Sequence, residues 1–223
     1  MNMQLDERVS IIERDAPIVI VCPHGYDDHG TAGLGEIISK NLACSHVINK
    51  GWRKAKKHDY WKDHADCNDL RHCSENVVID EFLKPIIRFV KKAINSYGEC
   101  YVFNIHGMGI KNRPPDLDIV LGCGEEKNLT CKSKSRDSFL HYLNLHEFNV
   151  YKGENFFSGK NRYNLNQLFK QWVSLPAESF QLELVPYLRD KKQQDKTAEN
   201  ISKSIENLIN NPIVNSIKSF KSF

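Results

Sequence analysis

The sequence lacks long apolar runs, an export signal and a strong excess of charge. No apolar stretch approaches the roughly 20 residues that a membrane-spanning helix needs, so we expect no membrane segment. Residues 1–14 are polar and mixed in charge, without the basic start and apolar stretch of a secretory signal. The 31 lysines and arginines nearly balance the 28 aspartates and glutamates, which does not favour nucleic acid as a partner. These absences predict a cytoplasmic protein that binds neither nucleic acid nor a membrane.

The cysteines also lack a pattern. Seven are present, and no two of them form a Cys-x-x-Cys pair, the close spacing usual in structural zinc sites. Their odd number and scattered positions predict reduced thiols, with a structural zinc site as the alternative. No internal repeat or low-complexity segment divides the chain, and 223 residues suit a single domain of the larger kind. We therefore predict one domain over residues 1–223.

Short apolar runs that alternate with helical patterns are what the sequence does contain. The apolar runs predict strands at 16–22, 45–49, 100–105, 117–121 and 180–185. Apolar positions every three or four residues predict helices at 31–42, 80–98, 135–145, 165–173 and 197–209. Strands that alternate with helices indicate a layered α/β sheet. Residues 50–74 are predicted to form a long irregular loop, and residues 210–223 a loose tail.

Histidines follow or end two of the predicted strands, in the stretches VCPHGYDDHGT and FNIHGMG. Ligands of open α/β sheets bind at the carboxyl ends of strands, so His24 and His106 are expected to converge there. Asp27 and Asp28 can each bring a carboxylate oxygen to the same point. Two imidazoles and a carboxylate are a usual ligand set of a catalytic zinc, which keeps one position open for water. The pattern predicts an open metal site, with His29 as a rival ligand that we expect to face away.

Glu183 lies in the middle of the apolar run FQLELV, where an unpaired carboxylate would cost several kcal/mol. Such a residue needs a partner or a chemical task. One interpretation makes it the general base beside a metal-activated water, whose pKa zinc lowers to about 7. The other interpretation is a buried ion pair with Arg162 or Arg113.

Taken in order, the motifs of this chain resemble those of the N-formylglutamate amidohydrolase family, which shares its fold and metal chemistry with the zinc carboxypeptidases. The resemblance runs from about residue 18 to residue 190. It rests on VCPHG, DHGT, ADCN, NIHG, DIVLG, FFSGKNRYN, and FQLEL followed closely by a proline and a tyrosine. It implies a three-layer α/β/α sandwich with a mixed, mostly parallel sheet, of the phosphorylase/hydrolase-like type.

The resemblance also implies roles for single residues of the metal site. His24 and His106 would be the two imidazole ligands, and Glu183 matches the catalytic glutamate. Asp28 opens the D-x-G-T motif and is the preferred third ligand, whereas Asp27 fits the His-x-x-acid spacing of the carboxypeptidases. Neighbouring polar groups, with Asn104 and Asp118 as candidates, would orient the imidazoles.

For substrate binding, Asn68 matches the asparagine of a motif that usually reads D-x-N-R in relatives. Here Asp69 replaces the arginine, which removes a bidentate partner for a substrate carboxylate. Arg162 is the first candidate to supply the missing cation, and Arg113 and Arg71 are further candidates.

The expected function is metal-dependent hydrolysis of an amide bond in an N-acyl amino acid, such as an N-formyl amino acid, or in a related small amide, through metal-activated water. Zinc is the expected cofactor, although another divalent transition metal could occupy a mixed nitrogen and oxygen site. The expected partner is a small N-acyl amino acid or a short peptide. Two alternatives stay open: a zinc peptidase that acts on C-terminal or cell-wall peptides, and a catalytically inactive relative that binds a ligand.

Overall fold

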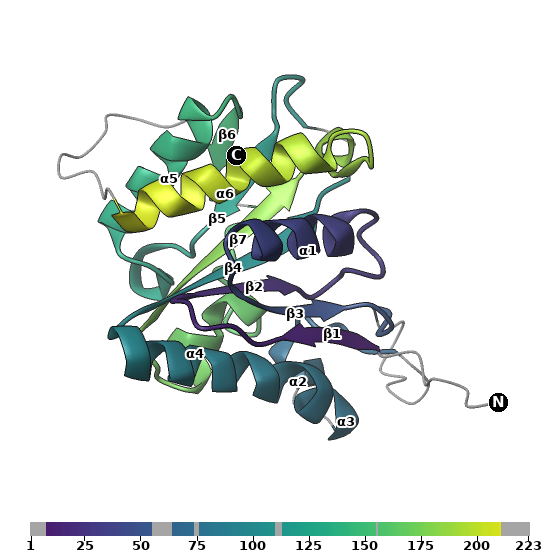
Figure 1. The fold of residues 1–223 in the computed structure, drawn as a ribbon, viewed down its shortest axis with the longest axis vertical. Helices are drawn as coiled ribbons and strands as arrows, with labels where there is room; N and C mark the ends of the chain where they lie inside the picture. Colours follow the sequence, from purple (N-terminus) through teal and green to yellow (C-terminus); the bar gives the residue numbers. More distant parts are fainter. Residues whose placement is uncertain (1–7, 55–63, 74–75, 110–112, 155, 211–223) are drawn as a thin grey trace.

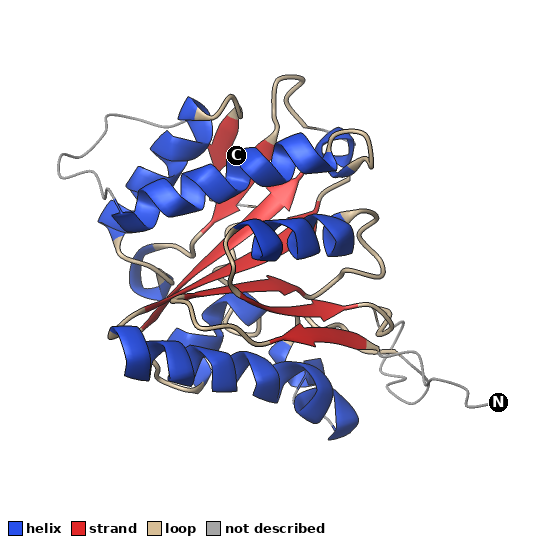
Figure 2. Cartoon of the chain, in the orientation of Figure 1, coloured by secondary structure: helices blue, strands red, loops and turns tan. Residues whose placement is uncertain are grey.

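A seven-stranded sheet with helices on both faces forms the centre of the protein (Figure 1, Figure 2). The computed structural model describes residues 8–54, 64–73, 76–109, 113–154 and 156–210. Residues 211–223 of the predicted tail and 55–63 of the predicted loop lie outside the described residues. The strands are β1 (Val9–Ile12), β2 (Ile18–Cys22), β3 (Ser45–Asn49), β4 (Cys100–Gly107), β5 (Ile119–Gly122), β6 (Val150–Lys152) and β7 (Ala177–Leu184).

The strands are arranged in the order β1-β3-β2-β4-β7-β5-β6. Neighbours β3 and β2, β2 and β4, β4 and β7, and β5 and β6 pair in parallel. The pairs β1 with β3 and β5 with β7 are antiparallel. The sheet is therefore mixed and mostly parallel, and the predicted α/β class is confirmed. Its central strands β2, β3, β4 and β7 are almost entirely buried because helices cover both of their faces.

Helices α1 (Thr31–Asn41), α5 (Ser133–Leu145) and α6 (Gln194–Asn210) cover one face of the sheet (Figure 1). Helix α4 (Lys84–Tyr97) covers the other face, preceded by the short α2 (Leu70–Cys73) and α3 (Asn76–Val78). Single helical turns complete the described part: Ile79–Leu83, Glu126–Asn128, Leu165–Gln167, Leu168–Trp172 and Pro186–Arg189. None of the helices in the described ranges is long and apolar enough to cross a membrane.

Alternation along β4 and β7 separates apolar core from polar site. Phe103 and Phe180 point to the α1, α5 and α6 side, where their rings stack with centroids 5.2 Å apart. Because successive side chains of a strand point to opposite faces, His106 and Glu183 point to the opposite side. The two strands pair in parallel with His106 directly beside Glu183.

Most predicted elements are present, with four differences. Strand β1 was not predicted because it is an edge strand in which only Val9 is buried, so it carries no apolar run. Strand β6, which is only three residues long, was not predicted either. The predicted helix at 165–173 is a 3-10 turn followed by a π turn. The predicted irregular loop 50–74 contains the one-turn helix α2 at its end.

Candidate functional site

The site lies where three adjacent parallel strands end. Strands β2, β4 and β7 are neighbours, and their carboxyl ends reach the same edge of the sheet. His24 follows β2 by two residues, while His106 and Glu183 lie near the ends of β4 and β7. The strand order thereby brings distant parts of the sequence to one edge of the sheet.

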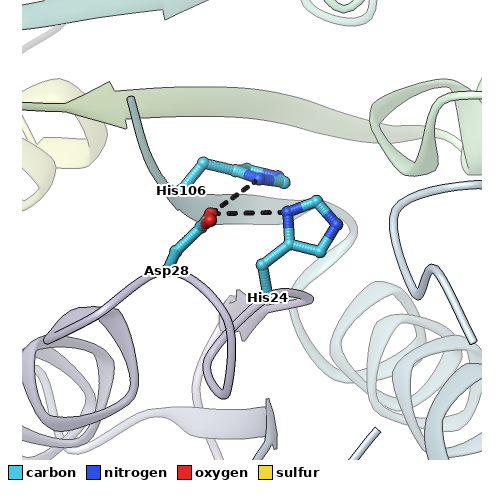
Figure 3. Close-up of side chains that lie close together, drawn as sticks. All are labelled: His24, Asp28 and His106. Atoms are coloured by element: carbon cyan, nitrogen blue, oxygen red, sulfur yellow. Dashed lines mark ion pairs between the residues drawn. The ribbon is translucent and has the colours of Figure 1, made fainter. Parts of the chain in front are cut away.

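His24, Asp28 and His106 form a compact cluster in which one ligand atom of each lies within 4.8 Å of the others. The Oδ2 atom of Asp28 is 3.4 Å from Nδ1 of His24 and 3.9 Å from Nδ1 of His106. The two imidazoles meet edge to face, with ring centroids 5.0 Å apart. Figure 3 shows the Asp28 carboxylate facing both rings.

Asp28 is held in place by two further groups. The backbone N–H of Gly107 donates to Oδ2 of Asp28 at 3.0 Å, which joins the loop after β2 to the end of β4. The Lys54 ammonium group donates to Oδ1 at 3.2 Å. Burial would raise the pKa of Asp28, but the hydrogen bond and charge of His24, with help from Gly107 and Lys54, lower it. The carboxylate is therefore ionised at neutral pH.

Asp66 holds the outer nitrogen of His24. Its Oδ1 atom lies 2.7 Å from Nε2 of His24, so Nδ1 of that ring is left to face Asp28. Carboxylates often bind the second nitrogen of a metal-ligating histidine and fix its orientation in this way. Sequence reasoning missed Asp66. The available signal was an aspartate within the ADCN motif, two residues before Asn68. Asn104 and Asp118 do not have this role in the described part of the chain: the Asn104 amide donates to Asn166 and Ser179, and the Asp118 carboxylate accepts from Asn149 and Tyr187.

The pKa values of the two imidazoles are shifted in opposite directions. Complete burial, together with the nearby His24, lowers the pKa of His106 to about 3, so this ring is neutral at physiological pH. Burial would also lower the pKa of His24, but the carboxylates of Asp28 and Asp66 outweigh it and raise the pKa. Neutral imidazole is the form that binds a metal.

Glu183 is almost fully buried, with 5% of its surface exposed. Burial and the charge of Asp28 raise its pKa to about 7. The side-chain amide of Gln181 donates to Oε1 of Glu183 at 2.9 Å. Among the described residues neither Arg162 nor Arg113 makes an ion pair with it, so the alternative of a buried salt bridge has no partner there.

A cavity of about 430 Å³ opens over the cluster. This volume suits a small ligand. The cavity is lined by His24, Asp28, His106 and Glu183, and also by residues 157–161 and Asn164. Asn68 also lines it, and the Oδ1 atom of Asn68 is buried without a hydrogen-bond partner.

The other predicted site residues do not line this cavity. Arg162 is exposed and its guanidinium lies over the Tyr163 ring, while Arg113 donates to the Leu117 carbonyl at 3.0 Å. The cations that do line it, Lys54 and Lys160, were not predicted. A lysine in a polar loop carries no signal in one sequence that separates it from the solvated lysines around it.

Asp27 and His29, the other two candidate ligands near His24, do not take part in the cluster. Asp27 is exposed and accepts a hydrogen bond from the backbone N–H of Lys54 at 2.5 Å. His29 is also exposed, and neither side chain belongs to the cluster of metal-binding atoms. Asp28 is thus the acid that the loop turns toward the imidazoles.

The donor set fits a divalent transition metal. Zinc binds imidazole nitrogen and carboxylate oxygen at about 2.0–2.2 Å, so two ligands of one ion lie roughly 3–4 Å apart. The distances from Oδ2 of Asp28 to the two Nδ1 atoms, 3.4 and 3.9 Å, fall in this range. His24, Asp28 and His106 are therefore the residues that would hold the ion.

Comparison with known proteins supports the fold. No protein-family model and no curated protein matches the sequence. Among solved structures, a gene product of Agrobacterium tumefaciens has a TM-score of 0.64 at 11% identity, over 92% of this chain and 95% of its own. An N-formylglutamate amidohydrolase from Ralstonia eutropha has a TM-score of 0.60 at 12% identity, over 92% and 98%. A bacteriophage poly-gamma-glutamate hydrolase has a TM-score of 0.59 at 14% identity, over 93% and 92%.

The expected resemblance to the N-formylglutamate amidohydrolase fold is thereby confirmed. TM-scores of 0.59–0.64 over 92–93% of this chain establish a shared fold. Because the identities are only 11–14%, the functional argument rests on the residues of the site.

Proposed function

We propose that this protein is a metal-dependent hydrolase that cleaves the amide bond of an N-acyl amino acid or a related small amide, with zinc as the metal. The observation that carries the proposal is the meeting of two imidazole Nδ1 atoms and the Asp28 carboxylate beside a buried glutamate, at the floor of a cavity. We also propose a single domain in the cytoplasm, with neither nucleic acid nor a membrane as partner.

The residues suit the two tasks of such a reaction. When bound, a zinc ion supplies Lewis acidity, which polarises a substrate carbonyl and brings the pKa of a coordinated water to about 7. Glu183 would accept a proton and return it to the leaving amine, a role favoured by a pKa of about 7. The Gln181 amide fixes the direction of the Glu183 carboxylate through its 2.9 Å hydrogen bond.

Substrate recognition would use groups on the cavity wall. Asn68 offers an unpartnered oxygen to a substrate N–H or O–H group. Asp69 stands where relatives have an arginine, and Arg71 does not take the place of that arginine. The Arg71 guanidinium donates to Asp69, and Arg71 does not line the cavity. We therefore propose Lys160 as the cation for a substrate carboxylate, in place of Arg162 or Arg113. Lys160 lines the cavity, and its ammonium group lies 2.9 Å from Oε2 of Glu125.

The test is turnover of a defined panel by the zinc-loaded protein, with Glu183→Gln as the inactive variant. We expect hydrolysis of at least one N-formyl or N-acyl amino acid, and a loss in kcat/KM of about 10²–10⁴-fold in the variant, the usual contribution of a general base. Glu178→Gln is the matched control, since Glu178 lies on the same strand near its other end, paired with Lys132. Equal activity of Glu183→Gln and the parent would refute the proposed role.

The same panel separates the alternatives. Short peptides and γ-glutamyl peptides belong in it because a peptidase would use the same metal site and the same base. Preference for peptides over N-acyl amino acids would identify the peptidase alternative. Zinc binding without turnover of any amide would identify a ligand-binding relative.

A further inference from the structure

Arg189 is a buried arginine just behind the candidate metal site, with 7% of its surface exposed. It lies at the end of the helical turn Pro186–Arg189, between β7 and α6. Its guanidinium donates to three backbone carbonyls: Nε to Leu184 at 3.2 Å, Nη2 to Met108 at 3.2 Å, and Nη1 to His29. All three acceptors are main-chain groups, so the contact depends on the path of the backbone and not on neighbouring side chains.

Each acceptor belongs to a segment that carries a site residue. The His29 carbonyl follows Asp28 directly, the Met108 carbonyl is two residues after His106, and the Leu184 carbonyl follows Glu183. Strands β4 and β7 are already joined by their ladder, in which the backbone N–H of Met108 donates to the Leu184 carbonyl at 3.0 Å. The loop after β2 has no place in that ladder. Arg189 therefore fastens the loop that carries His24 and Asp28 to the two strand ends.

Two glycines allow this close approach. A Cβ atom on Gly107 would lie 2.4 Å from Cζ of Arg189, and one on Gly30 would lie 2.2 Å from the Arg189 carbonyl oxygen. Gly30 also has a φ of +85°, in the left-handed region that favours glycine. Gln194, at the start of α6, binds both carbonyls, donating to Gly30 at 2.8 Å and to Arg189 at 3.0 Å. The chain thus packs closely against the guanidinium of Arg189 at Gly107 and against its backbone at Gly30.

The charge of Arg189 has no carboxylate in direct contact. Within the described ranges no acidic oxygen lies within ion-pair distance of its guanidinium, whereas the charges of Asp28 and Glu183 act on it from farther away. A buried cation without a partner is costly, and one placed behind two gathered carboxylates offsets part of their mutual repulsion. The charges of Asp28 and Glu183 thus offset part of the cost of burying this cation.

We propose that Arg189 is a positioning residue, which holds the loop of His24 and Asp28 against the ends of β4 and β7 and thereby sets the metal affinity of the site. This inference rests on the proposed metal site. It predicts that removing the guanidinium weakens metal binding even though Arg189 touches no metal ligand side chain directly.

The test compares zinc affinity in the parent, Arg189→Met and Arg189→Lys, measured by equilibrium competition with a chromogenic chelator. Residues behind metal ligands typically change affinity by about 10–100-fold, and we expect a rise of that size in the zinc dissociation constant of Arg189→Met. Arg189→Lys keeps the charge but loses the planar fork of donors, so we expect an intermediate rise. Arg88→Met is the control, because Arg88 is an exposed arginine on α4 paired with Glu13, and it should match the parent.

Two further readings separate positioning from plain stability. The visible spectrum of the cobalt-loaded protein should change in Arg189→Met, since the ligand geometry changes, while the metal-free melting temperature reports the fold alone. A lower melting temperature with parent-like zinc affinity and an unchanged cobalt spectrum would overturn the proposal. If Arg189→Met does not fold, Arg189→Lys decides: an affinity within twofold of the parent overturns it, and a loss of fivefold or more supports it. A parent that binds no zinc would remove the metal site itself, and this inference with it.

Discussion

At the scale of single residues, the buried position of Glu183 makes ionisation of its carboxyl group unfavourable. Its pKa is raised to about 7 by burial and by the charge of Asp28. Because this value lies above that of the unfolded chain, the folded protein binds the proton more tightly. The associated stability is present at low pH and is lost as the pH rises toward and through 7. Glu183 therefore destabilises the metal-free protein under the conditions in which it would act as a base.

Glu183→Gln should stabilise the metal-free protein at pH 8, because the neutral amide avoids the cost of a buried charge. We expect a gain of about 3 kcal/mol, or roughly 6–12 °C in melting temperature, which falls below about 1 kcal/mol near pH 5. Thermal unfolding of metal-free parent and variant at both pH values measures this difference. Glu178→Gln, on the same strand, should show no such pH-dependent gain. An equal shift at both pH values would contradict the raised pKa.

Lys160 is the residue on which the proposed substrate class depends. Lys160 lines the cavity, and its ammonium group is hydrogen bonded to Glu125 at 2.9 Å. Replacing it by methionine removes one charge-assisted contact to a substrate carboxylate, so Lys160→Met should raise KM about tenfold and leave kcat nearly unchanged. Steady-state kinetics on the best substrate of the panel tests this, with Lys91→Met on the exposed side of α4 as control. An unchanged KM would place the substrate carboxylate elsewhere.

At the scale of elements, the close packing of α1 on β2 positions the loop that carries His24 and Asp28. Gly35 of α1 allows this approach, because a Cβ atom there would lie 2.3 Å from Sγ of Cys22. Gly33 lies two residues earlier on the same helix. A Cβ atom there would lie 3.2 Å from Oε1 of Gln194, at the end of that side chain. The two glycines thus differ in what an added methyl group would meet.

Gly35→Ala should destabilise the protein by about 1–3 kcal/mol, the usual cost of overpacking a core. Gly33→Ala should stay within about 1 kcal/mol of the parent, because alanine favours a helix and the Gln194 amide, although hydrogen bonded to Gly30 and Arg189, needs to shift only slightly. Urea unfolding of the two variants measures both values. Similar stability of the two variants would show that the contact between α1 and β2 is not as tight as described.

The predictable and the unpredictable parts of the structure divide along physical lines. Buried runs such as Ile18–Cys22 and helices with one apolar stripe such as α4 carry their pattern in the sequence, because both are selected by burial. Strand β1 does not, because its outer residues are exposed at the sheet edge. In the site, His24, Asp28, His106 and Glu183 end up together as their place near strand ends indicated.

What could not be predicted depends on contacts between distant segments. Asp66 reaches His24 across 42 positions of sequence, and Arg189 reaches the His29 carbonyl across 160. Arg189 has no local pattern that distinguishes it from other charged residues, and the only signal for Asp66 was its place in the ADCN motif. Lys160 and Arg162 differ only by two positions in one loop, and the path of that loop decides which of them lines the cavity.

At the scale of the whole molecule, metal binding should be coupled to folding, since the three ligands come together only in the folded chain. Zinc at about 100 times its dissociation constant should stabilise the protein by roughly 2.7 kcal/mol. Thermal unfolding with and without zinc measures this, and His106→Ala should abolish the shift. A shift of equal size in that variant would mean that zinc binds at another place.

The most direct test of the account is anomalous diffraction at the zinc absorption edge from crystals of the zinc-loaded protein. We expect one strong peak bonded to Nδ1 of His24, Nδ1 of His106 and a carboxylate oxygen of Asp28, at about 2.0–2.2 Å from each. A crystal with full zinc loading and no peak between these three residues would contradict the central claim.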